Sequence, residues 1–224
     1  MVWVHGGAWM IGDKANQLED KIALFTNAGW ALASINYRLS PNPPSTDPAR
    51  LTYPAHPRDV AAAVQWLRGH ATELGVDPAR IAMLGHSAGA HLVALVSTDE
   101  SFGVSGGIRC TGSFDTEAYD VVAALDGATA QQTQILLNAF TDDVQLQIAG
   151  SPINHVTAAA PPFLVAVRGS AERQMTQRRF ATAVGASVID ASALSHEEVN
   201  ASIGAAGDTV MTQPIMEFLT GCFE

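Results

Sequence analysis

Residues 81–91 read Ile-Ala-Met-Leu-Gly-His-Ser-Ala-Gly-Ala-His, and this stretch decides the fold. An apolar run typical of a buried strand ends at Gly85, and an alanine-rich run of helical period begins at Ala88. The Gly-x-Ser-x-Gly pattern at their junction places Ser87 on a sharp turn from strand to helix. Only small residues, here Gly85 and Gly89, avoid a clash two positions before and after such a serine. The context favours an exposed nucleophile at Ser87 over a chance match in a loop.

The rest of the chain repeats this alternation of short apolar runs with longer stretches of helical period. Such a pattern predicts an α/β protein in which a mostly parallel sheet is covered by helices on both faces. We treat residues 1–224 as a single domain of this class. The expected strands are 2–5, 31–37, 81–85, 108–113, 163–167 and 187–189. The expected helices are 18–28, 59–74, 88–98, 174–184 and 210–219.

Two segments do not fit a strand–helix unit. Residues 40–57 contain six prolines and are expected to form an extended surface loop. Residues 114–162 lie between two expected strands and mix polar and helical stretches. An insertion at this place is a candidate lid or cap.

A second motif, His-Gly-Gly-Ala-Trp at residues 5–9, follows the first expected strand directly. Consecutive glycines allow backbone N–H groups to turn towards the oxygen of a tetrahedral intermediate. We therefore expect an oxyanion hole from the amides of Gly6, Gly7 and Ala8, together with Ala88 at the start of the helix after the nucleophile. His5 precedes the nucleophile and is expected to hold this loop through a hydrogen bond.

The general base is expected to follow the nucleophile in the chain. His196 lies after the last expected strand, and it is the only histidine beyond position 155. Without the other motifs, a solvated loop histidine would be the simpler interpretation; with them, we predict His196 as the base of Ser87. His86 and His91 lie too close to Ser87 in sequence to serve as its base, and we expect them to line or support the pocket.

Three carboxylates compete for the place beside His196. Glu172 follows the expected strand 163–167 and satisfies the order serine, acid, histidine, so it is predicted as the third member of the triad. Its alternative role is a solvated carboxylate at a helix start. In that case Asp190 or Asp115 would serve His196.

Composition excludes several classes of protein. The formal net charge is −10, and the longest basic cluster is Arg178-Arg179, so a nucleic-acid partner is not expected. No stretch approaches the roughly twenty apolar residues of a membrane helix. No secretory signal is visible, which makes the cytoplasm the expected location. Cys110 and Cys222 are far apart in sequence and are interpreted as free thiols.

Four stretches together carry a family resemblance: His-Gly-Gly-Ala-Trp at 5–9, Asn-Tyr-Arg-Leu-Ser-Pro at 36–41, Tyr53-Pro54 leading to Asp59, and Gly-His-Ser-Ala-Gly-Ala-His-Leu at 85–92. The chain resembles the carboxylesterases of the α/β-hydrolase fold, in particular the hormone-sensitive-lipase-like and arylformamidase-like group. The resemblance covers nearly the whole chain. It implies a cofactor-free hydrolase, without a metal, that acts on small esters, aryl esters or N-formyl amides.

The resemblance also assigns residues and reveals two departures. It implies Ser87 as nucleophile, His196 as base, and the 6–8 loop with Ala88 as oxyanion hole. Family members usually carry aspartate after the penultimate strand, where this chain offers Glu172. They also carry some tens of residues before the oxyanion motif, where this chain has four.

Several expectations remain open at this point. Trp9, His91 and Tyr119 are candidates for the substrate pocket, with core packing as the alternative. The expected substrate is a small-molecule ester, with formamide hydrolysis as the second reaction and a non-catalytic ligand receptor as the rival class. If strand 31–37 is an open edge, we expect either further residues upstream or a homodimer formed there.

Overall fold

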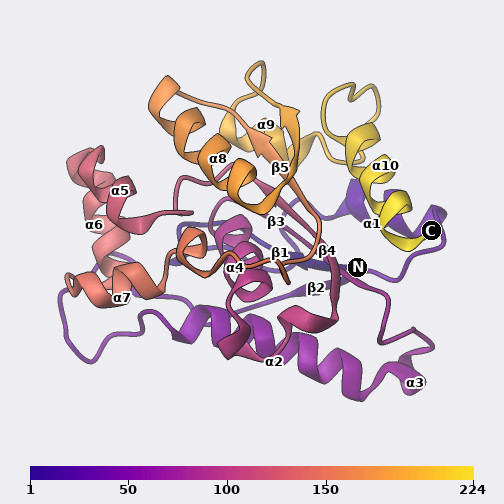
Figure 1. The fold of residues 1–224 in the computed structure, drawn as a ribbon, viewed down its shortest axis with the longest axis horizontal. Coiled ribbons are helices and arrows are strands. Elements are labelled where there is room, and N and C mark those ends of the chain that lie inside the picture. Colours follow the sequence, from indigo (N-terminus) through magenta and orange to yellow (C-terminus); the bar gives the residue numbers. More distant parts are fainter.

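Six parallel strands form one sheet in the computed structural model, which describes residues 1–224 (Figure 1). In sheet order they are β2 (Ala33–Ile35), β1 (Val2–Val4), β3 (Ile81–His86), β4 (Ile108–Phe114), β5 (Phe163–Val167) and β6 (Ser187–Asp190). All six predicted strands are confirmed, with small differences at their ends. The chain leaves β1 for β2 on one side and then returns to β3 on the other. Ligand sites of open parallel sheets lie at such a switch point, which here falls between β1 and β3.

Alternate residues of the strands pack on opposite faces of the sheet. Val2, Val4 and Met83 belong to the hydrophobic cluster with α2 (Ala55–Gly69) and α4 (Ala88–Thr98). Trp3 and Leu84 belong to the cluster with α1 (Glu19–Asn27), α9 (His196–Ala201) and α10 (Thr212–Phe223). Helix α8 (Ala171–Val184) packs on β5. Strands buried on both faces explain the nearly continuous apolar runs of the sequence.

The proline-rich segment is extended for most of its expected length. It lacks regular structure up to Pro54, but α2 begins at Ala55, so the predicted loop is wrong at its last three residues. Pro57 is accommodated because the first turn of a helix needs no backbone N–H donor. The single helix expected over 59–74 is interrupted at His70 and continues as α3 (Ala71–Leu74).

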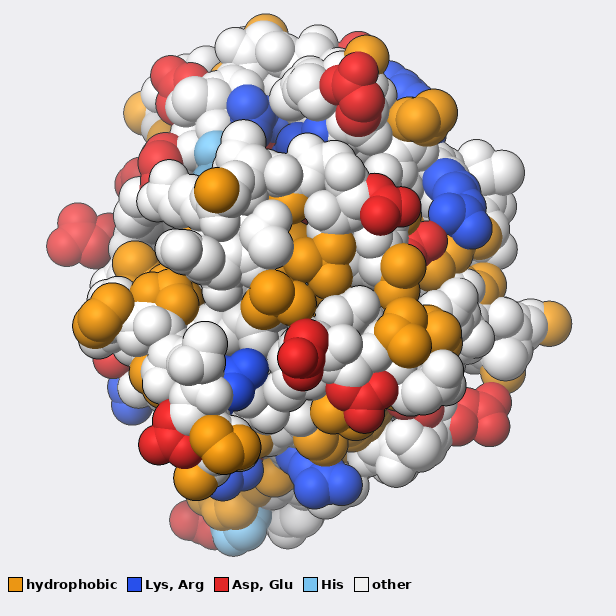
Figure 2. Space-filling view, turned by 90° about the vertical axis from the view of Figure 1, so that its left-hand side faces the viewer, with side chains coloured by type: hydrophobic (Ala, Val, Ile, Leu, Met, Phe, Trp, Pro, Cys, Tyr) orange, Lys and Arg blue, Asp and Glu red, His pale blue; other side chains and the backbone are white.

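Residues 114–162 contain three helices gathered at one end of the molecule, on the left in Figure 1. These are α5 (Val121–Asp126), α6 (Ala130–Phe140) and α7 (Val144–Ala149), followed by a short 3-10 helix, η3 (Pro152–His155). Val121, Leu136 and Phe140 join the hydrophobic cluster of α2 and α4. Hydrophobic side chains are visible on this side of the molecule (Figure 2), and Val144 and Ile148 of α7 are among the exposed ones. A lid function for the segment stays a prediction.

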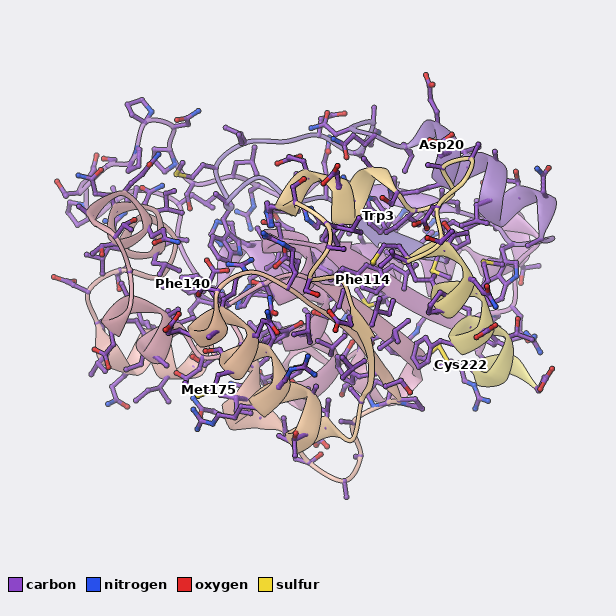
Figure 3. All side chains as sticks on the ribbon, turned by 90° about the horizontal axis from the view of Figure 1, so that it is seen from above. Trp3, Asp20, Phe114, Phe140, Met175 and Cys222 are labelled. Carbon is purple, nitrogen blue, oxygen red and sulfur yellow. A yellow bond between two sulfur atoms is a disulfide. The ribbon has the colours of Figure 1, made fainter.

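The interpretation of both cysteines as free thiols is wrong in the structure. Cys110 of β4 and Cys222 of α10 form a disulfide with a Cα–Cα distance of 6.3 Å; Cys222 is labelled on α10 in Figure 3. Both residues belong to the same buried cluster, because α10 covers the sheet face towards which Cys110 points. The disulfide therefore ties the last helix to the middle of the sheet, a connection that 112 residues of separation conceal in the sequence.

Reduction of this disulfide is expected to destabilise the fold. A crosslink that closes a long loop restricts the unfolded chain, and its loss typically costs roughly 2–5 kcal/mol. The midpoint of urea unfolding should fall when reductant is added. The Cys222→Ser variant should unfold at the lower midpoint with or without reductant. Equal midpoints for the oxidised and reduced wild-type chain would contradict the disulfide.

The helices are all too short or too polar to cross a lipid bilayer. The strand expected over residues 31–37 is observed as β2 at residues 33–35, and it lies at one edge of the sheet. The homodimer expected at this edge stays a prediction.

Candidate active site

The nucleophile turn has the expected conformation. Ser87 has φ 57° and ψ −121°, values that a serine adopts only when its surroundings enforce them. A Cβ added to Gly85 would clash with the backbone of Gly89, and one added to Gly89 would lie 2.6 Å from the carbonyl oxygen of His5. The two glycines thus allow β3, α4 and the oxyanion loop to approach one another. Ser87 consequently stands at the carboxyl end of β3, before the first turn of α4.

His196 lies beside Ser87, as predicted. Its Nε2 is 3.0 Å from Ser87 Oγ, although 109 residues separate the two in sequence. His196 is the first residue of α9, and a capping box formed by Ser195 and Glu198 fixes the start of this helix. The cap therefore orients the histidine towards the end of β3.

The carboxylate beside His196 is Asp115, and the prediction of Glu172 is wrong. Asp115 Oδ2 lies 2.6 Å from His196 Nδ1. Glu172 is an exposed residue in the first turn of α8, where Ser170 caps the helix, and it makes no hydrogen bond to His196. Its alternative role, a solvated carboxylate at a helix start, is the one observed. Asp190 is also exposed and accepts a hydrogen bond from the N–H of Ser192.

Asp115 directly follows Phe114, the last residue of β4, which is labelled near the centre of the molecule in Figure 3. Strand β4 pairs with β3, so the acid and the nucleophile end neighbouring strands. Ionised Asp115 can only accept hydrogen bonds, which assigns the proton of the shared bond to His196 Nδ1. His196 Nε2 is then the acceptor that faces the Ser87 hydroxyl.

Asp115 is fully buried, yet it is held as a carboxylate. Burial opposes its ionisation, but hydrogen bonds from His196 and Arg168 and the charge of Arg173 together hold the pKa of Asp115 well below its usual range. Arg168 Nη1 donates to Oδ2 at 3.0 Å, and Arg173 Nε donates to Oδ1 at 2.9 Å. Gln177 Nε2 adds a further bond to Oδ1. None of these three donors was predicted from the sequence.

His86 holds the backbone of His196 through a hydrogen bond. Its Nε2 donates to the backbone oxygen of His196 at 2.9 Å, and the two rings lie 4.5 Å apart. The pKa of His86 is lowered to about 3. Burial is the main cause, and the nearby His196 is the second. A neutral His86 can therefore hold the His196 backbone without adding a positive charge.

The expected oxyanion loop borders the same cavity as Ser87 and His196. This cavity has a volume of about 360 Å³, and Gly6, Gly7 and Ala8 form part of its wall. A Cβ on Gly6 would lie 3.1 Å from the Cβ of Ser87, so only glycine lets this backbone come so near the nucleophile. The backbone N–H groups of these three residues and of Ala88 donate to no group of the protein.

His5 supports the loop, as predicted. Its Nδ1 lies 2.7 Å from the carbonyl oxygen of Gly6, and its ring stacks on Tyr37 with 4.5 Å between centroids. The Tyr37 hydroxyl donates to the backbone oxygen of His5. Burial lowers the pKa of His5, which favours the neutral ring in this stack.

The three candidate pocket residues belong to the core instead, so their prediction as pocket residues is wrong. Trp9, His91 and Tyr119 are buried, and none borders the cavity at Ser87. Trp9 Nε1 donates to His91 Nδ1, and His91 Nε2 donates to the carbonyl oxygen of Gly150. Tyr119 stacks on Phe180 with 4.1 Å between centroids. The contacts of Trp9 and His91 join the oxyanion loop and α4 to the 114–162 segment, and Tyr119 joins this segment to α8.

Several further polar side chains, none of them predicted from the sequence, line the cavity. Asn16, Gln17, Glu197 and Asn200 line it, while Ala8 and Ile11 are its hydrophobic residues. Asn200 Nδ2 donates to Gln17 Oε1 at 2.6 Å. The Asn200 backbone oxygen accepts from Lys21 Nζ, whose pKa burial lowers to about 8. The cavity is therefore small, and most of its lining side chains carry polar groups.

His86, Asp115 and His196 come close enough together to surround one metal ion. The hydrogen bonds described above already engage His86 Nε2, His196 Nδ1 and His196 Nε2. A metal at this place would have to break the contact between the acid and the base. The arrangement fits proton transfer better than metal binding.

A family model and two curated relatives place the chain among known esterases. The BD-FAE family model matches residues 1–179. The probable carboxylic ester hydrolase LipM of Mycobacterium tuberculosis is 32% identical over 72% of this chain and 38% of its own length. Esterase LipQ of the same organism is 31% identical over 74% of this chain and 40% of its own length. The chain thus spans about two fifths of the length of these curated relatives.

A solved structure shares the fold. The hyperthermophilic esterase from the archaeon Pyrobaculum calidifontis superimposes with a TM-score of 0.78 at 20% sequence identity. The match covers 99% of this chain and 73% of that chain. The architecture is therefore that of the α/β-hydrolase fold, as the sequence resemblance implied.

Proposed function

Since the chain belongs to the BD-FAE family and has the α/β-hydrolase fold, we propose that it is a serine hydrolase that cleaves small carboxylic esters through an acyl-enzyme intermediate. The observation that carries this proposal is the hydrogen-bonded series from Ser87 through His196 to Asp115 at the cavity. A receptor that had lost catalysis would have no need of this alignment.

The geometry supports the following sequence of proton transfers. As Ser87 Oγ attacks the ester carbonyl carbon, His196 Nε2 accepts the hydroxyl proton, and Asp115 stabilises the resulting imidazolium through Nδ1–H. The imidazolium then donates the proton to the departing alkoxide, which leaves Ser87 acylated. In the second half, His196 takes a proton from water, the water oxygen attacks the acyl carbon, and Ser87 leaves with that proton.

The negative oxygen of each tetrahedral intermediate needs hydrogen-bond donors. The N–H groups of Gly6, Gly7 and Ala8 are available at the cavity wall, and Ala88 adds the first amide of α4. The start of a helix favours negative charge, and each such donor is typically worth about 10²–10³ in turnover. These four amides are the proposed oxyanion hole.

The cavity is expected to accept short acyl groups, and longer acyl groups are not expected to raise kcat/KM. In an apolar groove each added methylene contributes about 0.8 kcal/mol, so four would raise kcat/KM by roughly 200-fold. Ala8 and Ile11 are the only hydrophobic side chains that line this cavity, so it offers little aliphatic surface to a longer acyl chain. For p-nitrophenyl esters from butyrate to octanoate, kcat/KM should stay level or fall. A rise near 200-fold would contradict a small site with few hydrophobic side chains.

Ester and formamide hydrolysis use the same groups but differ in the leaving group. An amine leaves less readily than a phenolate and requires proton donation from His196 in the transition state. Parallel assays with p-nitrophenyl acetate and an N-formyl arylamine separate the two reactions. We expect turnover of the ester to exceed that of the formamide; the reverse ranking would make formamide hydrolysis the principal reaction.

The cellular compartment is a separate proposal. The cytoplasm was expected from the sequence, but disulfides persist mainly in oxidising compartments. The Cys110–Cys222 pair therefore supports function where thiols are oxidised. Alkylation of native cells before lysis tests this: both cysteines should resist a thiol reagent until a reductant is added.

A further inference from the structure

Two arginines occupy the place where the family resemblance positions the catalytic acid. Arg168 directly follows β5, and Arg173 lies in the first turn of α8. Their side chains are only 20% and 18% exposed, and both form ion pairs with the fully buried carboxylate of Asp115. The region after β5 thus supplies two cations to an acid that comes from β4.

Arg168 connects the acid with the loop that carries the base. Its Nη1 donates to Asp115 Oδ2, the same oxygen that accepts from His196 Nδ1. Its Nε donates at 3.1 Å to the backbone oxygen of Leu194, two residues before His196. One guanidinium group therefore fixes the distance between the carboxylate and the start of α9.

Arg173 holds the backbone conformation of the acid. Asp115 has φ 60°, which is unfavourable for a residue with a side chain. Arg173 Nε donates to Oδ1, and Arg173 Nη2 donates at 3.0 Å to the backbone oxygen of the same residue. These two bonds fix the side chain relative to its own backbone, and Arg173 also pairs with Glu117.

We propose that Arg168 and Arg173 are positioning residues of this hydrolase, which aim Asp115 at His196 and whose positive charges set the lower pH limit of catalysis. The inference rests on the proposed function and goes beyond it, because a serine–histidine–aspartate triad does not itself require a cation. Removal of either arginine should impair both the alignment of His196 and the activity at low pH.

The pH effect follows from the charges around the imidazole. Protonation of His196 removes the acceptor that Ser87 needs, and a nearby cation opposes that protonation. Without one of these two cations the imidazole is protonated more easily, so activity should be lost at a higher pH. Other ionisable groups near the site are His5, Lys21, His86, Glu117, Glu197 and Glu198. All of these groups remain in the variants below, so a shift reports on the arginine that is replaced.

The test compares Arg168→Gln and Arg173→Gln with Arg179→Gln. Arg179 lies on the same helix as Arg173 and pairs with Asp120 at the surface, which makes it a matched control for the loss of an ion pair. Arg168→Lys keeps the charge but loses the forked geometry. For each protein, kcat and KM for p-nitrophenyl acetate are measured from pH 5 to pH 9, together with the thermal midpoint.

We expect Arg168→Gln and Arg173→Gln to lower kcat by about 10–100-fold with little change in KM, the range known for residues that orient metal-ligating side chains. Their activity should also disappear at a higher pH than in the wild type. Arg168→Lys should keep the wild-type pH limit and recover part of kcat. Arg179→Gln should match the wild type in both.

Two results would overturn the inference and are distinguishable. If the glutamine variants lose thermal stability but keep the wild-type kcat and pH limit, the arginines are structural only. If Arg168→Gln does not fold, Arg168→Lys and Arg173→Gln still decide. An unchanged kcat in both, with an unchanged pH limit in Arg173→Gln, contradicts a positioning role. An inactive wild type would instead refute the proposed hydrolase function, and the inference with it.

Discussion

Replacing Ser87 by alanine is expected to remove ester hydrolysis almost completely, with a fall in kcat on the order of 10⁶ or to the limit of detection. Ser87 provides the oxygen that becomes acylated, and the turn at φ 57° holds no other hydroxyl in its place. The measurement is turnover of p-nitrophenyl acetate by purified wild-type and variant protein, with circular dichroism to confirm that both are folded.

The control for this prediction is Ser192→Ala. Ser192 is an exposed residue on the turn after β6 and takes no part in the proposed mechanism. It should leave turnover unchanged. Substantial activity in Ser87→Ala would show that another group is the nucleophile.

The second large effect is expected for Asp115→Asn, which should lower kcat by about 10⁴. Asparagine can donate from its amide, and this reverses the hydrogen bond that keeps the His196 proton on Nδ1. The side chain would also lose its ion pairs with Arg168 and Arg173. Turnover at saturating p-nitrophenyl acetate measures the effect.

Glu172→Gln and Asp190→Asn are the matched controls, since each removes one of the carboxylates that the sequence left in competition. Both side chains are exposed and neither forms a hydrogen bond with His196, so both variants should retain near-normal turnover. If Glu172→Gln loses its activity while Asp115→Asn keeps it, Glu172 and not Asp115 is the acid of the triad.

Local chemistry explains why much of the fold could be predicted. Strands buried on two faces require apolar runs, and the turn at Ser87 requires Gly85 and Gly89, so each leaves a signal within a few residues. The glycine pattern identifies Ser87 as the nucleophile. Chain order then leaves His196 as the one histidine after the last expected strand, and so as the base.

The acid could not be found in this way. Asp115, Glu172 and Asp190 all satisfy the order serine, acid, histidine, and nothing local separates them. The distinction is tertiary: Asp115 ends a strand paired with that of Ser87, and Arg168 and Arg173 compensate for its burial. One signal was available, since a carboxylate after β4 stands next to the nucleophile strand in a parallel sheet.

The other errors have the same physical origin. Trp9 is the last residue of the oxyanion motif, yet its indole packs inward against His91 and Phe140. Cys110 and Cys222 become neighbours only because α10 returns across the sheet face on which Cys110 lies. Proximity that arises from packing leaves no periodic pattern, which explains why neither could be predicted.

Labelling with a fluorophosphonate, followed by peptide mass spectrometry, tests the central claim most directly. An activated serine attacks the phosphorus, expels fluoride and keeps the phosphonyl group, whereas an ordinary serine does not react. The account predicts one phosphonyl group per chain, located on Ser87, with loss of esterase activity in proportion to labelling. An unlabelled chain that still hydrolyses esters, or a label on another residue that accounts for the inactivation, would contradict it.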